Sequence, residues 1–265
     1  MKIDVRRVAT WGAWTLGVLA ALVALYLSVF FLPYPLFPYH LEAEGFHLYS
    51  DQQIPTGFEE VLRESRTRLE AMELYRGEEP LRIFVCQSHD LFRFIVRMSG
   101  RRHAGQGLLI SVAGNAFFSQ EMIAEVGRRN RGRPVHTRLQ GSWPAAIAHE
   151  QAHELVFAEV GFRSARRIPV WKSEGYADYQ ANKAAIDADA DYDLRRRVGT
   201  LLDDGAWTSP TAFVDRRHFR WQLQVEFLCE VDGLDFNGLL RETVTDSQAR
   251  ERMIQWYHEG VHEGP

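Results

Sequence analysis

Two histidines and a glutamate stand at metal-binding spacing in the pentapeptide His149-Glu150-Gln151-Ala152-His153. Positions i and i+4 lie on one face of a helix, so both imidazoles can reach one cation without distortion of the backbone. Glu150 would project close to the metal without binding it, which suits a base that takes a proton from a water molecule. The pentapeptide alone would also fit two surface or core histidines.

A second acidic pair follows on the next predicted helical segment, residues 169–184. Glu174 lies 25 positions after His149 (174 − 149) and could complete a ligand set with His149 and His153. Three nitrogen and oxygen ligands with one open position are typical of a catalytic zinc site, so we expect one Zn²⁺ per chain. Asp178 shares the helical face of Glu174 and could accept the far N–H of a ligand histidine. Gly175 could allow close approach of another helix.

The two segments together, HEQAH and WKSEGYADY, resemble the gluzincin metallopeptidases, the group around thermolysin and the M1-type aminopeptidases. The resemblance implies a zincin-like domain, in which a small mixed sheet packs on the HExxH helix and a mainly helical half follows. It also implies that His149, His153 and Glu174 bind zinc and that Glu150 is the general base. Asp178 matches the aspartate that follows the glutamate ligand by four positions in the thermolysin branch.

A weaker similarity lies upstream, where Asn115 and Ala116 begin an Asn-Ala-Phe-Phe stretch similar to thermolysin's substrate-lining edge strand. The resemblance makes these two residues candidates for substrate binding, although a buried core strand fits the same letters. The chain lacks the GxMEN stretch of the M1 enzymes, so an aminopeptidase role is not supported. It also lacks the HExxHxxGxxH extension, which excludes the three-histidine pattern.

Peptide hydrolysis also needs a donor for the oxyanion of the transition state. Three side chains are candidates: His218, Tyr176 and Tyr179. We favour His218 as a catalytic residue because it opens an apolar helical segment, where related enzymes place a Tyr or His that faces the metal. A capping or surface role for His218, and packing roles for the tyrosines, remain alternatives.

The N-terminal part of the chain predicts a membrane anchor. Residues 8–39 contain no Asp, Glu, Lys or Arg, and a helix needs roughly 20 apolar residues to cross a bilayer. Basic residues precede this stretch and acidic residues follow it, which favours a cytoplasmic tail (residues 1–8), a transmembrane helix (9–33) and an extracytoplasmic catalytic domain. A cleavable signal sequence is the alternative, but its apolar region would be unusually long.

The remaining chain predicts an α+β fold with two subdomains, an α/β part (34–142) and a helical part that carries the zinc site (143–265). Apolar patterning predicts strands at 45–50 and 81–86, two short strands within 107–118 that are broken at Gly114, and helices at 57–75 and 90–98. Beyond Pro144, glycines and prolines at 161, 169, 199, 210 and 233 divide four or five helical segments, two of them at 217–231 and 247–257. Ser142 and Gly161 suit the two ends of the HExxH helix.

Composition excludes several other classes of protein. The 265 residues carry a formal net charge of −4, which argues against a nucleic-acid partner despite a basic run at residues 128–133. Cys86 and Cys229 are too few for a disulfide framework or a cysteine zinc site, and two buried thiols are favoured over one disulfide. We therefore expect a membrane-anchored zinc endopeptidase that acts on a peptide or protein substrate. The alternatives are a non-catalytic metal-binding scaffold and a zinc hydrolase of a non-peptide amide.

Overall fold

The computed structural model describes residues 5–77, 82–101, 107–124, 142–203 and 216–261. A five-stranded mixed sheet forms the centre of the first half, in the order β1-β2-β3-β5-β4. The inner pairs β2–β3 and β3–β5 are parallel, whereas the outer pairs β1–β2 and β4–β5 are antiparallel. The strands are β1 (Tyr39–Ala43), β2 (Phe46–Ser50), β3 (Arg82–Cys86), β4 (Gly107–Ile110) and β5 (Asn115–Ser119). The α+β class and the mixed sheet are thus confirmed.

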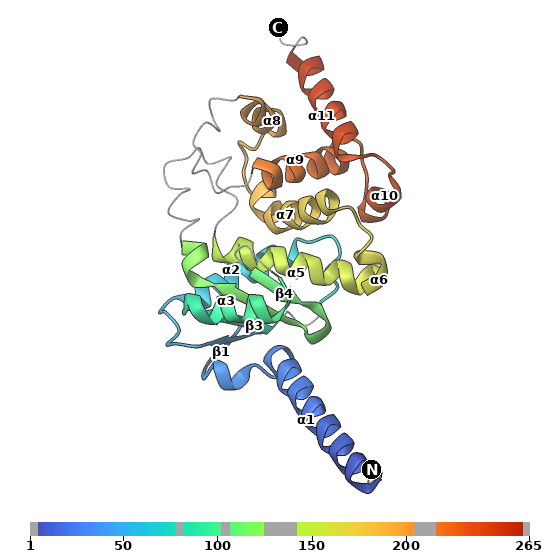
Figure 1. The fold of residues 1–265 in the computed structure, drawn as a ribbon. Coiled ribbons are helices and arrows are strands. Elements are labelled where there is room, and N and C mark those ends of the chain that lie inside the picture. Colours follow the sequence, from blue (N-terminus) through green and yellow to red (C-terminus); the bar gives the residue numbers. More distant parts are fainter. Residues whose placement is uncertain (1–4, 78–81, 102–106, 125–141, 204–215, 262–265) are drawn as a thin grey trace.

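Alternation along the strands gives the sheet two apolar faces. One face, with Ile83 and Val85 of β3, joins the main core beneath α2 (Phe58–Glu70) and α5 (Trp143–Val160). The opposite face, with Phe84 and Cys86, packs on α3 (His89–Met98) and on the end of α1 (Val5–Phe31). Successive strand residues point to opposite sides, so one strand feeds both clusters. Figure 1 shows α5 on one side of the sheet and α1 leaving from the other.

Helices dominate the second half. α7 (Val170–Asp187) packs between α5 and α9 (Arg216–Glu230), and α8 (Leu194–Leu202) and α11 (Asp246–Val261) lie beyond α9 (Figure 1). Two short helices, α6 (Phe162–Ala165) and α10 (Phe236–Arg241), bring the number after residue 142 to seven within the described residues. The expectation of four or five was too low, and Gly199 lies inside α8 instead of separating two helices. The main core takes residues from both halves, and the subdomain boundary at 142/143 stays a prediction.

Most other boundaries agree with the sequence patterns, although the helix expected at 57–75 ends at Glu70 and the helix expected at 247–257 continues to Val261. The strands expected at 45–50, 81–86 and on either side of Gly114 are present, and Gly114 lies in the left-handed region with φ of 59°. Strand β1 was not expected, because its outward positions are polar and it directly follows a stretch with three prolines, Pro33, Pro35 and Pro38. The basic run at 128–133 lies outside the described residues.

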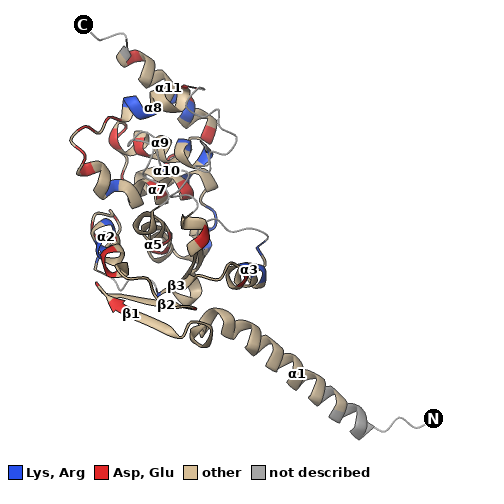
Figure 2. Ribbon diagram, turned by 90° about the vertical axis from the view of Figure 1, so that its left-hand side faces the viewer, with Lys and Arg blue, Asp and Glu red and all other residues tan. Residues whose placement is uncertain are grey.

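The N-terminal helix α1 extends away from the domain. Its described side chains include no Lys, Arg, Asp or Glu, and the 18-residue window Trp14–Phe31 is long and apolar enough to cross a membrane (Figure 2). The last turns of α1 nevertheless contact the domain. The Tyr26 hydroxyl donates to the carbonyl of Met98 at 2.7 Å, and the Asn115 amide donates to the carbonyl of Phe30 at 2.6 Å.

Candidate metal centre

The ends of α5 place the HExxH residues on its central turns. Ser142 caps the helix, because its hydroxyl accepts from the backbone N–H of Ala145 at 3.3 Å. Gly161 ends the helix, as predicted. The apolar sides of α5 pack on α2, α7 and the sheet. This packing leaves His149, Glu150 and His153 partly exposed on the remaining part of its surface.

Three side chains from α5 and α7 converge on one point. Nε2 of His149 lies 3.2 Å from Nε2 of His153, and Oε2 of Glu174 lies 3.4 Å and 3.6 Å from these two nitrogens. In a tetrahedral site with bonds of about 2.0–2.1 Å, neighbouring ligand atoms are about 3.3–3.4 Å apart. All three sides of the observed triangle lie within about 0.2 Å of this spacing, so the residues fit a zinc ion. The structure therefore brings together the three ligands that the sequence predicted.

Hydrogen bonds on the far side orient both imidazoles. Nδ1 of His149 lies 2.8 Å from Oδ1 of Asp178, and a carboxylate can only accept, so Nδ1 carries a proton and Nε2 is the nitrogen that could bind a metal by losing its own proton. Nδ1 of His153 lies 3.5 Å from the hydroxyl of Ser173. Asp178 thus has the position that the sequence predicted. Ser173 was not singled out, although it directly precedes Glu174.

The carboxylates and histidines of the centre stabilise one another in their charged forms. Burial by itself would raise the pKa of Glu174 and of Asp178, but hydrogen bonds and charges from neighbouring histidines hold both pKa values below their usual range. Burial would lower the pKa of His149, yet the contacts with Asp178 and Glu174 raise it well above its usual value. Without a metal, the cluster is thus a cation held between two carboxylates.

Glu150 lies against the first residue of the edge strand β4. A Cβ atom built on Gly107 would stand 2.6 Å from Oε1 of Glu150 and 3.1 Å from its Cδ and Cγ. Only a residue without a side chain leaves the carboxylate in this place. Gly107 is a second residue that sequence reasoning missed, because it precedes Glu150 by 43 positions (150 − 107) in no shared motif.

Of the three candidate donors for the oxyanion, one contacts a residue of the centre and two do not. His218 lies at the site, where its Nδ1 is 3.2 Å from Oδ2 of Asp178. Burial lowers the pKa of His218, but the contact with Asp178 outweighs this and raises it. Tyr176 is buried and donates to Glu73 at 3.3 Å, and Tyr179 donates to Glu230. Both tyrosine hydroxyls are therefore bound away from the three ligands.

The predicted substrate residues lie elsewhere. Asn115 and Ala116 are fully buried in β5, which is an inner strand of the sheet between β3 and β4. The Asn115 amide binds the end of α1 instead of facing the metal ligands. The structure thus gives no support to the prediction that these residues line the substrate site, which stays untested. The edge strand beside α5 is β4, and the Asn-Ala-Phe-Phe letters reflect a core strand.

The sequence also predicted a close approach of helices at Gly175 and two free thiols at Cys86 and Cys229. A Cβ on Gly175 would stand 2.4 Å from the backbone oxygen of Trp221, so Gly175 lets α7 approach α9 closely. Cys86 and Cys229 are both free thiols, as favoured. They belong to different apolar clusters, Cys86 beside α3 and Cys229 against the main core.

Comparison with known proteins gives no family for the chain. No protein-family model matches it, and no curated protein matches it. The functional conclusion therefore rests on the site itself.

Proposed function

We propose that this chain is a membrane-anchored zinc metallopeptidase that cleaves peptide bonds in peptide or protein substrates. The observation that carries the proposal is the triangle of ligand atoms from His149, His153 and Glu174, with sides of 3.2, 3.4 and 3.6 Å. Glu150 follows His149 directly on the same helix and is not one of the three ligands. The gluzincin-like spacing of these residues adds support independent of the geometry.

The residues of the chain would share the reaction as follows. Zinc bound by the three ligands would act as a Lewis acid and would lower the pKa of a water molecule to about 7. Glu150 would take the proton of the attacking water and pass it to the leaving amine. Asp178 would hold His149 in the tautomer that leaves Nε2 free. In its protonated form, which the contact of Nδ1 with Asp178 favours, His218 would donate from its other ring nitrogen to the oxyanion.

The membrane part of the proposal depends on α1. Lys2, Arg6 and Arg7 precede the apolar stretch, and Glu42 and Glu44 follow it, so the N-terminus would be cytoplasmic and the metal centre extracytoplasmic. The hydrogen bonds from Tyr26 and Asn115 support a retained anchor over a cleaved signal. Cleavage would leave the buried Asn115 amide without this partner.

The test uses the full-length protein in detergent, purified in parallel with Glu150→Gln and His149→Ala. We expect about one zinc at this centre in the wild type and in Glu150→Gln, and none at it in His149→Ala. Cleavage of a peptide library, read by mass spectrometry, should fall by ~10²–10⁴-fold in Glu150→Gln, as loss of a general base predicts. The glutamine variant also controls for contaminating proteases.

Three results would contradict the proposal. Equal cleavage by wild type and Glu150→Gln would remove Glu150 as the base. A folded wild-type protein whose zinc content does not depend on His149 would remove the metal centre. Zinc at the centre without cleavage of any peptide would favour a binding scaffold or a hydrolase of a different amide.

A further inference from the structure

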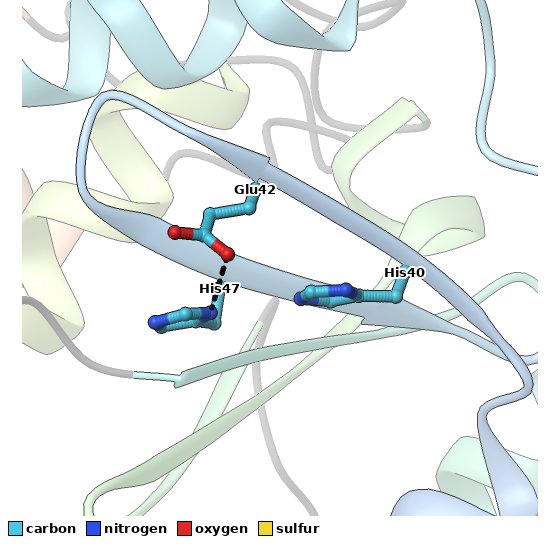
Figure 3. A group of neighbouring side chains, drawn as sticks. All are labelled: His40, Glu42 and His47. Atoms are coloured by element: carbon cyan, nitrogen blue, oxygen red, sulfur yellow. Dashed lines mark ion pairs between the residues drawn. The ribbon is translucent and has the colours of Figure 1, made fainter.

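A second group of side chains that could bind a metal lies on the hairpin of β1 and β2, away from α5. His40 and Glu42 stand on β1, and His47 stands on β2 directly opposite Glu42. We propose that these three residues, the hairpin cluster, bind a second divalent transition-metal ion, Zn²⁺ or Cu²⁺, independently of the HExxH centre. Figure 3 shows the three side chains together on one side of the hairpin.

The positions follow from the register of the hairpin. Residues 40 and 42 point to the same side of β1, and their partners Tyr49 and His47 point to that side of β2. Leu41 and Ala43, which alternate with them, pack against the main core that also contains α5. The hairpin cluster therefore lies on the opposite face of the sheet from the HExxH helix. One ion cannot reach both sets of ligands.

The ligand atoms are already close. One ligand atom from each residue lies within 4.8 Å of the other two, and Nδ1 of His47 lies 3.7 Å from Oε2 of Glu42. Ligands at bonds of about 2.0–2.2 Å in a tetrahedral site are about 3.3–3.6 Å apart. The two imidazole planes differ by only 8°, and they lie side by side in Figure 3 with Glu42 above His47. Small side-chain rotations would therefore bring the three atoms onto one ion.

An aromatic column holds one of the ligands in place. The ring of His40 stacks on Tyr49 with centroids 4.5 Å apart, and Tyr49 stacks on the buried Phe84 with centroids 5.1 Å apart. His40 is exposed, but this stacking restricts its ring before any ion arrives. A ligand that is already ordered loses less conformational entropy on binding. This order distinguishes the cluster from a chance group of mobile surface side chains.

The ligand types select the ion. Two imidazoles and one carboxylate suit zinc and copper, whereas calcium and magnesium prefer oxygen ligands alone. A bound ion would clamp β1 to β2 at the edge of the sheet. The chain also offers a matched comparison, because His89 pairs with Glu121 at 3.3 Å with similar exposure. Among the described residues, no third metal-binding side chain completes this second pair.

The test measures the zinc content per chain of the full-length protein in detergent. The protein is first stripped of metal with EDTA and then dialysed against Zn²⁺ in the low micromolar range. We expect His40→Gln and His47→Gln each to lose one equivalent relative to wild type, and His89→Gln to lose none. His149→Ala should lose the zinc of the HExxH centre and keep the zinc of the hairpin cluster. Failure of one site would therefore not be confused with failure of the other. In hydrogen exchange, Zn²⁺ should slow the amides of residues 39–50 in wild type and not in His47→Gln.

Several outcomes would overturn the proposal. Wild-type zinc content in both His40→Gln and His47→Gln would show that the cluster holds no ion. An equal loss in His89→Gln would show unspecific binding to surface histidines. A loss in His47→Gln alone would reduce the site to a Glu42–His47 pair and exclude the three-ligand arrangement. Zinc-independent exchange in residues 39–50 would exclude a clamp on the hairpin.

Discussion

The contact between Gly107 and Glu150 gives a direct way to displace the proposed general base without touching the three candidate metal ligands. In Gly107→Ala, the new methyl group would stand 2.6 Å from Oε1 of Glu150. The backbone of Gly107 is not in the left-handed region, so alanine introduces no backbone strain. The carboxylate of Glu150 is the flexible partner and must move.

The size of the effect follows from the distance. An ordinary contact between these atoms begins at 3.4 Å, so Oε1 must retreat by about 0.8 Å (3.4 − 2.6). A misplacement of roughly 1 Å at a reacting group can cost on the order of 100-fold in rate, which corresponds to about 2.7 kcal/mol in the activation free energy. The free energy of unfolding should change by no more than about 1 kcal/mol, because a side chain yields and no backbone moves.

The assay compares kcat/KM, zinc content and urea denaturation of Gly107→Ala with wild type. Gly17→Ala is the matched control, since a Cβ at Gly17 meets no atom within 4 Å. We expect a loss of activity near 100-fold in Gly107→Ala, with wild-type zinc and stability, and no loss in Gly17→Ala. Wild-type kcat/KM in Gly107→Ala would refute the assignment of Glu150 as a base held against β4. Loss of zinc together with activity would show that the strand supports the ligands instead.

Four further predictions test the centre and the helix packing around it. Gly175→Ala should lower the free energy of unfolding by about 3 kcal/mol in urea denaturation, because its methyl group would meet the backbone of α9 at 2.4 Å; wild-type stability would contradict the close packing of α7 and α9. Asp178→Ala, which removes both acceptor oxygens, should weaken zinc binding by ~10–100-fold in a chelator competition assay, and an unchanged affinity would exclude its role on His149. Partial burial, with nearby Glu73 and Glu230, raises the pKa of Cys229 to about 12, so iodoacetamide at pH 8 should label it much more slowly in the folded than in the unfolded protein, and equal labelling rates would contradict the raised pKa. In EDTA, the free energy of unfolding should fall as pH rises from about 6.5 through the raised pKa of His149, because the folded state then loses the proton that it holds more tightly than the unfolded state does. It should also fall below about pH 4, where Glu174, whose pKa is lowered in the folded state, takes up a proton. Urea denaturation as a function of pH should show a steeper alkaline slope in wild type than in His149→Gln, where His218 keeps its contact with Asp178.

Local patterns predicted the elements well, and they also predicted which side chains would converge at the candidate centre. The cap at Ser142, the stop at Gly161 and the i, i+4 spacing of the histidines are properties of one helix, and the structure has all three. Glu174 and Asp178 were also predictable, because both belong to one face of the next helix. These signals depend on residues a few positions apart, where the geometry of a helix fixes the relation.

Relations between distant elements were harder to predict. The order of the strands could not be read from their sequences, so the similarity of Asn115 and Ala116 to a substrate-lining edge strand could not be decided against the alternative of a core strand. The place of Gly107 beside Glu150 depends on how β4 docks on α5, which no local pattern encodes. The polar outward face of β1 concealed a strand that brings His40 next to His47.

Asp178 shows how one buried carboxylate can link elements that the sequence keeps apart. Its Oδ1 contacts His149 of α5 at 2.8 Å, and its Oδ2 contacts His218 of α9 at 3.2 Å. Each oxygen accepts from one imidazole, which an aspartate can do and an asparagine cannot, because the amide nitrogen only donates. In Asp178→Asn, one of the two histidines must therefore lose its acceptor. If the amide oxygen stays with His149, zinc affinity is retained and the orientation of His218 is lost; if it turns to His218, the reverse follows. Zinc affinity and kcat, measured together in this variant, thus report which histidine depends more strongly on the carboxylate.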